Sequence, residues 1–173
     1  MALAVPPSRF QPRAGGGSAF YCLGGFTRMD IQKLQSEAEA GSIVAQGILG
    51  IAYLYGHDAP KDYTAALRWL TPAAERGAAR PTFHLGRMHE EGWGVPVDYK
   101  RAGHFYQRAA DGDEWLAYVY LARLYRYGRG TAAGEQAALD WYEAAVSESE
   151  TIAHCPELDE AREYVSSHHG PAA

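Results

Sequence analysis

The residues best suited to metal chemistry in this sequence are the two histidines of the segment FHLGRMHEE, His84 and His89. Zinc peptidases bind their metal with two histidines four positions apart, because that spacing places both side chains on one face of a helix. His84 and His89 are five positions apart, which separates them by about 140° around a helix. We therefore expect no metal site and no cofactor here, and we interpret His89 as a packing residue.

A second candidate for chemistry is the adjacent pair His154 and Cys155. A cysteine nucleophile needs a base within hydrogen-bond reach, and adjacency in the sequence does not supply that geometry. The sequence also lacks the Ser-x-x-Lys nucleophile motif. We expect His168 and His169 to be solvated, and the acidic residues of 148–163 to form a solvated helix face. The protein is therefore predicted not to be an enzyme.

The elements that must position these side chains recur at a fixed spacing of 36 positions. The matching residues are Leu49, Leu85 and Leu121; Gly56, Gly92 and Gly128; Ala66, Ala102 and Ala138; Ala73, Ala109 and Ala145; and the aromatic residues Trp69, Phe105 and Trp141. Such a period is typical of a solenoid, in which each unit buries its apolar face only against its neighbours. We predict an all-α fold, an α-solenoid of three helix-turn-helix repeats with capping helices at both ends.

Each unit is predicted to contain an A helix, a turn and a B helix, over 42–55 and 63–76 in the first unit. Glycines suited to a left-handed helix end open the three turns, at Gly56, Gly92 and Gly128. Two positions later, a positive φ is also expected at Asp58, Gly94 and Gly130. Asp62 and Asp98 precede B helices and are predicted N-caps. Small residues such as Gly86 are expected to let two helices approach closely.

Further helices are predicted at the two ends of the stack. The segment 30–40 aligns with the second half of a repeat, and 156–167 forms a last helix that covers the third unit. We accordingly divide the chain into a disordered N-terminal extension (1–28), the solenoid (29–167) and a flexible tail (168–173). Because Met29 directly precedes the first helix, the alternative that it is the natural start stays open.

Composition excludes several classes of function. The net charge of -5 disfavours nucleic acid as the main partner, since phosphate binding needs a clustered basic face. No apolar run is long enough to span a membrane, and prolines and glycines interrupt the N-terminal segment where an export signal would need an apolar stretch. We expect a cytoplasmic protein in which Cys22 and Cys155 are free thiols, with a single disulfide as the alternative.

The repeat pattern A-x3-L-G-x2-Y-x2-G-x-G-V-x2-D-x3-A-x2-W-x3-A-A-x2-G resembles the Sel-one-like repeat, a relative of the tetratricopeptide repeat. The second unit carries the pattern at Leu85, Gly86, Gly92, Gly94, Val95, Asp98, Ala102, Phe105, Ala109 and Ala110. With the half-repeats, the resemblance covers about 30–165. It departs from the pattern at Pro81, His89 and Asp58, and the third unit lacks the aspartate.

The resemblance implies a curved stack of helix pairs that serves as a protein-interaction scaffold, often as an adaptor in bacterial signalling or secretion. Some members are immunity proteins that neutralise a secreted effector, and this is the first alternative. Cysteine-rich members have been described as β-lactamases, which makes a hydrolase the second alternative. Those members carry a cysteine pair in each repeat, and the three units of this sequence have none.

The resemblance also implies that A helices line the concave face of the stack. Residues offset from the packing positions are therefore predicted to line a groove: Val44, Gly47, Ile51, Leu54, Arg80, Phe83, Arg87, Glu90, Leu116, Val119, Arg123 and Arg126. We expect a protein or peptide partner there, with apolar anchors near Ile51 and Phe83. Because the planar arginine fork accepts carboxylates bidentately, we expect acidic groups near Arg87, Arg123 and Arg126. The alternative is that these arginines are solvated or paired with Glu90 and neighbouring acids.

Overall fold

A computed structural model of the chain describes residues 30–132, 134–148 and 155–169. These residues form helices joined by turns, and no strand occurs among them. The helices are α1 (Ile31–Glu39), α2 (Ile43–Tyr55), α3 (Tyr63–Glu75), α4 (Ala79–Glu91), α5 (Tyr99–Ala110), α6 (Trp115–Arg126), α7 (Glu135–Glu148) and α8 (Pro156–His169). The predicted all-α class is thus confirmed.

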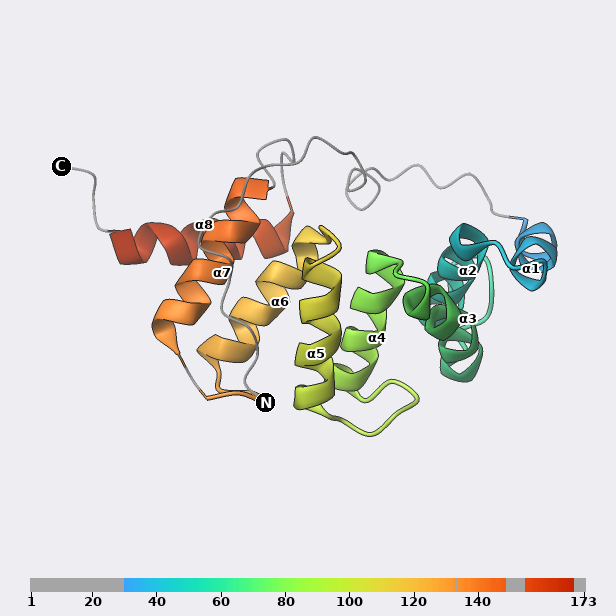
Figure 1. Cartoon of the computed structure of the whole chain (residues 1–173), viewed down its shortest axis with the longest axis horizontal. Helices are drawn as coiled ribbons and strands as arrows, with labels where there is room; N and C mark the ends of the chain where they lie inside the picture. The colour runs from blue at the N-terminus through green and yellow to red at the C-terminus, as the bar shows by residue number, and fades with distance from the viewer. Residues whose placement is uncertain (1–29, 133, 149–154, 170–173) are drawn as a thin grey trace.

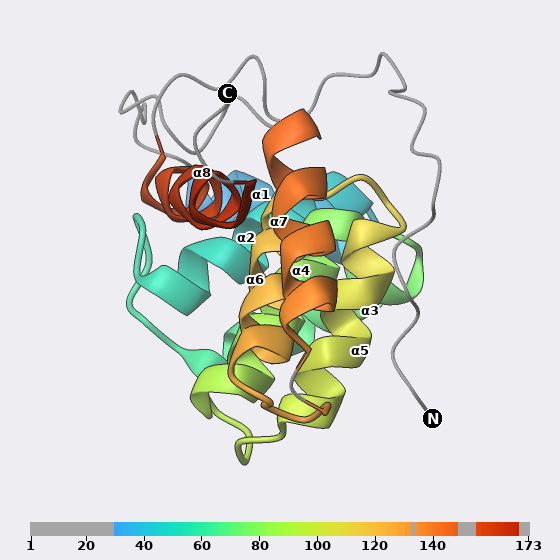
Figure 2. The same cartoon turned by 90° about the vertical axis from the view of Figure 1, so that its left-hand side faces the viewer.

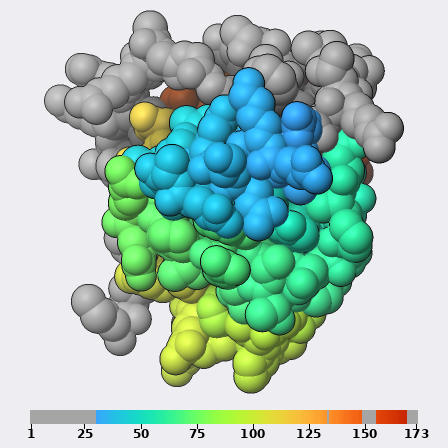
Figure 3. All heavy atoms as spheres, turned by 90° about the vertical axis from the view of Figure 1, so that its right-hand side faces the viewer, coloured from blue at the N-terminus to red at the C-terminus, as the bar shows by residue number. Residues whose placement is uncertain are grey.

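The helices stack as three hairpins along the long axis of the molecule (Figure 1). Each hairpin pairs an A helix with a B helix, α2 with α3, α4 with α5 and α6 with α7, and each B helix packs on the next A helix. Helix α1 lies across the N-terminal end of the stack, as the space-filling view shows (Figure 3). Helix α8 packs on α7 at the other end and runs across the hairpins rather than along them (Figure 2). The predicted solenoid with two capping helices is confirmed.

The helix ends follow the predicted capping chemistry. The Asp62 carboxylate accepts the backbone N–H groups of Thr64 and Ala65, and Asp98 accepts that of Arg101. Gly56 and Gly92 adopt φ values of 77° and 74°, as expected for a left-handed helix end.

Helix α6 ends one residue before the predicted position, at Arg126, so that Gly128 follows the C-cap instead of forming it. The turn itself is unchanged. The Arg129 N–H donates to the Leu124 carbonyl, just as the His57 N–H donates to the Ala52 carbonyl at the equivalent positions two repeats earlier.

The second glycine of each turn lies where successive hairpins touch. A Cβ atom on Gly94 would lie 2.7 Å from Cβ of Tyr63, and one on Gly130 would lie 2.6 Å from the backbone of Tyr99. Tyr63 and Tyr99 open the B helices of the preceding hairpins. The equivalent residue of the first turn is Asp58, at φ 55°. The helix that precedes this turn in the stack, α1, begins at Ile31, four positions after the residue equivalent to Tyr63. A side chain is therefore tolerated at this position only in the first turn.

Glycines also bring the two helices of a hairpin together. A Cβ atom on Gly50 would lie 2.6 Å from Cγ of Leu70, and one on Gly86 would lie 2.6 Å from the ring of Tyr106. The buried side chains gather into one large cluster over α4–α8 and two smaller clusters nearer the N-terminus.

The C-terminal helix is longer than predicted and reaches His169, so the first two residues assigned to the flexible tail are helical. The His168 side chain is 26% exposed; its imidazole lies 3.0 Å from a Glu135 carboxylate oxygen and stacks on Tyr164. The predictions for the extension 1–28, Met29, Cys22 and His154 fall outside the described residues.

Candidate interaction surface

Five of the twelve predicted groove residues lie in the protein interior. Leu54 and Phe83 are 1% exposed and Leu116 is 6% exposed. The Phe83 ring packs against Tyr106 and Tyr120, with ring centroids 5.6 and 5.1 Å away. Val119 and Gly47 are also buried, and a Cβ on Gly47 would lie 3.0 Å from Pro81. Because these side chains have almost no contact with solvent, they pack the solenoid and cannot directly contact a partner.

The accessible side chains of the A helices include part of the predicted set together with Ile48, which was not predicted. On α2 they are Val44, Ile48 and Ile51, which share one face at intervals of four and three residues. Val44 is 71% exposed and Ile48 is 38% exposed. One repeat later, this face continues with Arg87, and another repeat later with Arg123. We call this surface the A-helix face. Its accessible residues are Val44, Ile48, Ile51, Tyr55, Arg87, Trp93 and Arg123, and the buried ring of Tyr120, 6% exposed, lies beneath its arginines.

Arginines and aromatic rings alternate along the A-helix face. The Arg87 guanidinium lies 5.0 Å from the centroid of the Trp93 ring and 5.1 Å from that of Tyr120. Arg123 stacks on the same Tyr120 ring at 4.8 Å. Trp93 reaches this position because Gly92, at φ 74°, reverses the chain directly after α4. Contacts of a cation with an aromatic face contribute about 0.5–2 kcal/mol, so these arginines are held in place.

His84 supports this row from beneath. Its Nδ1 atom lies 3.2 Å from the Tyr55 hydroxyl, and its side chain is fully buried. Burial lowers the pKa of His84 to about 3, assisted by the positive charges of Arg80 and Arg87. The imidazole is therefore neutral at physiological pH and helps to orient Tyr55.

His89 points to a different helix and stacks on Phe105 of α5, with ring centroids 5.4 Å apart. The structure does not bring His84 and His89 together, and His89 packs as interpreted from the sequence. Within residues 30–132, 134–148 and 155–169, no three His, Cys, Asp or Glu side chains are grouped so that they could hold a metal ion.

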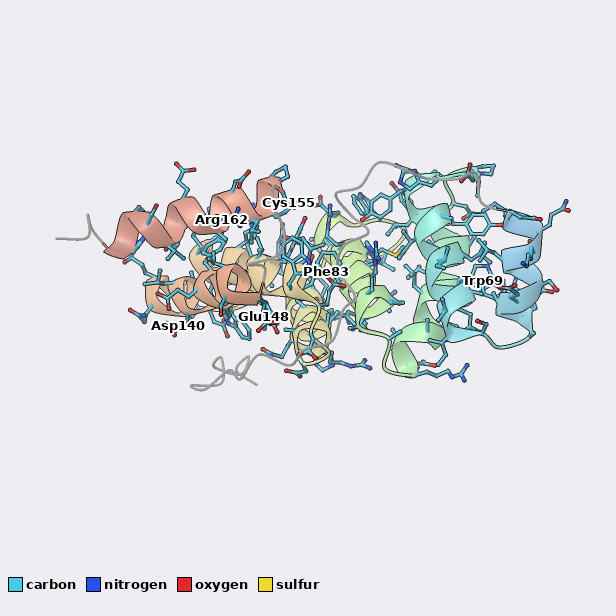
Figure 4. All side chains as sticks on the ribbon, turned by 90° about the horizontal axis from the view of Figure 1, so that it is seen from above. Trp69, Phe83, Asp140, Glu148, Cys155 and Arg162 are labelled. Atoms are coloured by element: carbon cyan, nitrogen blue, oxygen red, sulfur yellow. The ribbon has the colours of Figure 1, made fainter. Side chains whose placement is uncertain are left out.

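At the C-terminal end, the predicted partner-binding arginines contact the capping helix instead. Figure 4 shows α8 along this part of the stack, with Cys155 at its inner end and Arg162 further out. The Arg123 Nε and Nη2 atoms both donate to the Glu160 carboxylate of α8, and Tyr142 donates to it at 2.6 Å. Arg126 lies 3.9 Å from the same carboxylate.

The ionic contacts shift the titration of Glu160. Burial by itself would raise its pKa, but the hydrogen bonds from Arg123 and Tyr142 and the charges of Arg123 and Arg126 outweigh burial and hold the pKa below its usual value. Glu160 is therefore ionised at neutral pH, and it neutralises this end of the arginine row.

Two other predicted residues also have internal partners. Glu90 accepts a hydrogen bond from the Tyr106 hydroxyl at 2.5 Å and lies 4.0 Å from Arg129. Arg80 is half-buried and its charge acts on the buried carboxyl of Glu114. Of the predicted set, Val44, Ile51 and Arg87 thus remain as accessible members of the A-helix face without a contact to α8 among the described residues.

Sequence reasoning missed Tyr55, Trp93 and Tyr120 as members of this surface. The alignment of the repeats contained the information needed to find two of them. Tyr120 aligns with Ile48, and Trp93 lies at the variable position between the turn glycines Gly92 and Gly94. Aromatic residues at register positions next to the arginine-bearing row could have indicated them.

Helical hairpins stacked in register, with a continuous side formed by their A helices, define an α-solenoid repeat protein. The Sel1 repeat model matches three consecutive stretches, residues 43–77, 82–114 and 115–149, which together make up more than half of the chain. The chain therefore belongs to the Sel1 repeat family, as its resemblance to the Sel-one-like repeat predicted. Members of this family are generally protein-interaction scaffolds and are typically non-catalytic.

Solved structures agree with this assignment. The chain is 31% identical, with a TM-score of 0.66, to a protective antigen present in uropathogenic Escherichia coli strains that displays an SLR fold; the match covers 70% of this chain and 26% of that one. It is 26% identical, with a TM-score of 0.68, to a Sel1 repeat protein from Oxalobacter formigenes, over 78% of this chain and 52% of that one.

A third similar structure is the cysteine rich protein B of Helicobacter pylori, at 19% identity and a TM-score of 0.58, over 73% of this chain and 94% of that one. This likeness concerns the fold. The chain thus spans about a quarter and about half of the first two proteins. No curated protein matches it. In the described part of the chain, no helix has the length and apolar character needed to cross a membrane.

Proposed function

We propose that the protein is a non-catalytic scaffold that binds a segment of a partner protein along its A-helix face. The observation that carries the proposal is the aliphatic row of α2, formed by the exposed Val44 and Ile48 and the half-buried Ile51. In the next repeat this row is followed by the stacked Arg87. Aliphatic side chains grouped on an otherwise polar surface mark sites of protein contact, and aromatic and arginine side chains are enriched at interface centres.

The polar groups of this face favour recognition over catalysis. Its cations are arginines, which do not exchange protons near neutral pH, and the imidazole that supports it from beneath, His84, is buried and neutral. The exposed His57 ring lies at its edge, 6.0 Å from the ring of Tyr55. A general base must lie within reach of a substrate and titrate near the working pH. Recognition needs only a fixed shape and charge, which the stacking contacts supply.

Site-specific photo-cross-linking tests this function. A photoreactive phenylalanine analogue is introduced at Ile48 on the A-helix face or, as a matched control, at the exposed Thr71 on the B helix α3. We expect discrete cross-linked partner proteins from position 48 and none from position 71 when the full chain is irradiated in its native cells. Equal products from both positions, or none from position 48, would contradict the proposal.

A further inference from the structure

We infer that Arg87 is the point at which the A-helix face recognises a carboxylate side chain of the partner segment, and that Val44 and Ile48 receive an aliphatic side chain of the same segment. This inference rests on the proposed function and narrows it. Of the three arginines predicted to meet acidic groups, it retains one, and it identifies the partner by one acidic and one aliphatic residue at a defined separation.

Arg123 shows how an arginine at this position of the repeat binds a carboxylate. Arg87 and Arg123 are related by one repeat of 36 residues, and both stack on Tyr120. Arg123 presents its Nε and Nη2 atoms to the Glu160 carboxylate while the face of its guanidinium lies on the ring. A guanidinium in this position therefore has its edge available for a bidentate contact, which is the strongest form of arginine–carboxylate pairing.

Arg87 has the same support but lacks an equivalent carboxylate among the described residues. It is held between two rings, Trp93 and Tyr120. Its ion pair within the described chain is with Glu91, whose Oε1 atom lies 3.7 Å from Nη2, beyond hydrogen-bond distance. Its Nε atom is buried and has no hydrogen-bond partner there. A buried donor without a partner is costly, and a carboxylate from outside would satisfy it once the side chains that cover Nε move aside.

The stacking also favours binding by limiting what must be ordered. Fixing a flexible side chain on association opposes binding, and a long side chain such as arginine has much rotamer freedom to lose. Arg87 is already fixed by two ring faces, and its side chain is 20% exposed. A carboxylate that reaches it therefore meets a pre-formed receptor.

The aliphatic half of the site lies one helix away. Val44 and Ile48 belong to α2, which contacts α4, the helix of Arg87. Packed helices lie about 8–10 Å apart, and an extended chain advances about 3.3 Å per residue. A partner segment in extended conformation would therefore carry its acidic residue about three positions from its aliphatic residue. Charge complementarity thus commits the site to an acidic–aliphatic segment of a partner protein.

The test selects binders without assuming the motif. A random peptide library displayed on phage is panned against the full chain, and the recovered peptides are synthesised and titrated by fluorescence anisotropy. The protein variants are Arg87→Gln, Ile48→Ser and, as a matched control, Arg101→Gln, which removes an exposed arginine of α5 that pairs with Asp98. Thermal unfolding of each variant checks its fold.

We expect the selected peptides to share an Asp or Glu about three positions from Leu, Ile or Val. Arg87→Gln should weaken their binding about 10- to 100-fold, the loss expected for a charged hydrogen bond, and Arg101→Gln should leave it unchanged. Replacing the peptide's acid by its amide should produce the same loss on the wild-type chain. This last measurement needs no protein variant. When the amide peptide is titrated against Arg87→Gln, the loss of affinity should be no larger than for either change alone.

The outcomes separate this inference from the proposed function. Peptides that bind, respond to Ile48→Ser, but carry no shared acid and ignore Arg87→Gln would overturn the carboxylate assignment while leaving the scaffold function in place. Peptides that respond to neither Ile48→Ser nor Arg87→Gln would overturn both, because the A-helix face would then not be where the chain binds.

Discussion

Arg87 and Arg123 occupy the same position of consecutive repeats and stack on the same ring, yet their surroundings differ. In the C-terminal half, α8 delivers Glu160 to Arg123 and Arg126. In the N-terminal half, the A-helix face presents aliphatic side chains and an arginine with an unpaired Nε. A capping helix therefore does more than cover apolar surface, because here it also neutralises the end of a charged row. On our proposal, one end of the A-helix face stabilises the fold and the other end binds the partner.

The cores beneath the two halves differ as well. The cluster over α4–α8 is rich in aromatic side chains, whereas Leu49 lies in a small cluster with Ala38, Ala45 and Trp69. Leu49 and Leu121 occupy equivalent positions and are both fully buried. Truncating either leaves a cavity, and the cost depends on how far the surroundings can relax into it.

The largest effect should therefore come from Leu121→Ala compared with Leu49→Ala. We expect a loss of about 3–5 kcal/mol for Leu121→Ala, since large rings packed from several helices relax little, and about 2–3 kcal/mol for Leu49→Ala. Urea denaturation followed by circular dichroism, combined with hydrogen exchange of the two ends, measures the difference. Equal losses would mean that the two cores are equally rigid.

The next effect tests the close approach of α4 and α5. In Gly86→Ala the new methyl group would lie 2.6 Å from the Tyr106 ring, so we expect a loss of about 1–3 kcal/mol from overpacking. The matched control is Gly134→Ala, whose Cβ would meet its nearest neighbour at 3.6 Å. Thermal unfolding of both variants provides the measurement. A neutral Gly86→Ala would show that α5 can move away from α4 without cost.

A crossed pair of substitutions tests the division between stability and recognition directly. Arg123→Gln should cost about 1–3 kcal/mol, because it leaves Glu160 and its hydrogen-bonding groups without their main partner. Arg87→Gln should cost about 1 kcal/mol or less, since it removes stacking and a long ion pair. Chemical denaturation measures both. If Arg87→Gln destabilised the fold more than Arg123→Gln, the two halves would have been assigned in the wrong order.

The smallest effect is the pH dependence of the docking of α8. Two residues hold this helix, Glu160 and His168, and their pKa values are shifted in opposite directions. The pKa of Glu160 lies below its ordinary value of 4.5, so its contribution is present above that pH and is lost as the pH falls through the lower folded value. The Tyr164 carbonyl and Glu135 raise the pKa of His168 above 6.5, so its contribution is present below that pH and is lost as the pH rises through the raised value.

The methyl resonance of Ala161, buried on α8, should therefore report the firmest docking between about pH 4.5 and 6.5. Glu160→Gln should remove the acidic limb of the profile, and His168→Gln the alkaline limb. Glu163→Gln, an exposed position on the same helix, is the matched control and should leave both limbs. A profile unaffected by Glu160→Gln would refute the ionic role of Glu160.

The architecture could be predicted well from the sequence because the same pattern of leucine, glycine and alanine positions occurs in all three repeats. Helix limits and caps at Asp62, Asp98, Gly56 and Gly92 follow from local chemistry that a single chain reveals. The accessible face was harder to predict. An A helix in a solenoid is covered by its own B helix and by both neighbours, so the face left free is narrow. The predicted set therefore combined the buried Phe83 with the accessible Arg87.

The contact between Arg123 and Glu160 could not be derived from the repeat either. Helix α8 lies outside the three matched stretches, and no register relates it to α6. The position of α8 depends on which apolar surface the last hairpin leaves uncovered, and this can be seen only in the packed structure. The same holds for Trp93, whose place over Arg87 depends on the direction in which the chain leaves Gly92.

The crowded turn glycines also bear on engineering longer versions of the molecule. Gly94 and Gly130 are required because the opening residue of the preceding B helix presses against them, and the first turn carries Asp58 at that place. A designer who inserts an additional full hairpin ahead of α2 would bring such a B helix against the Asp58 side chain. Such an elongated protein would therefore need the substitution Asp58→Gly before the B helix of the added hairpin could pack against the first turn.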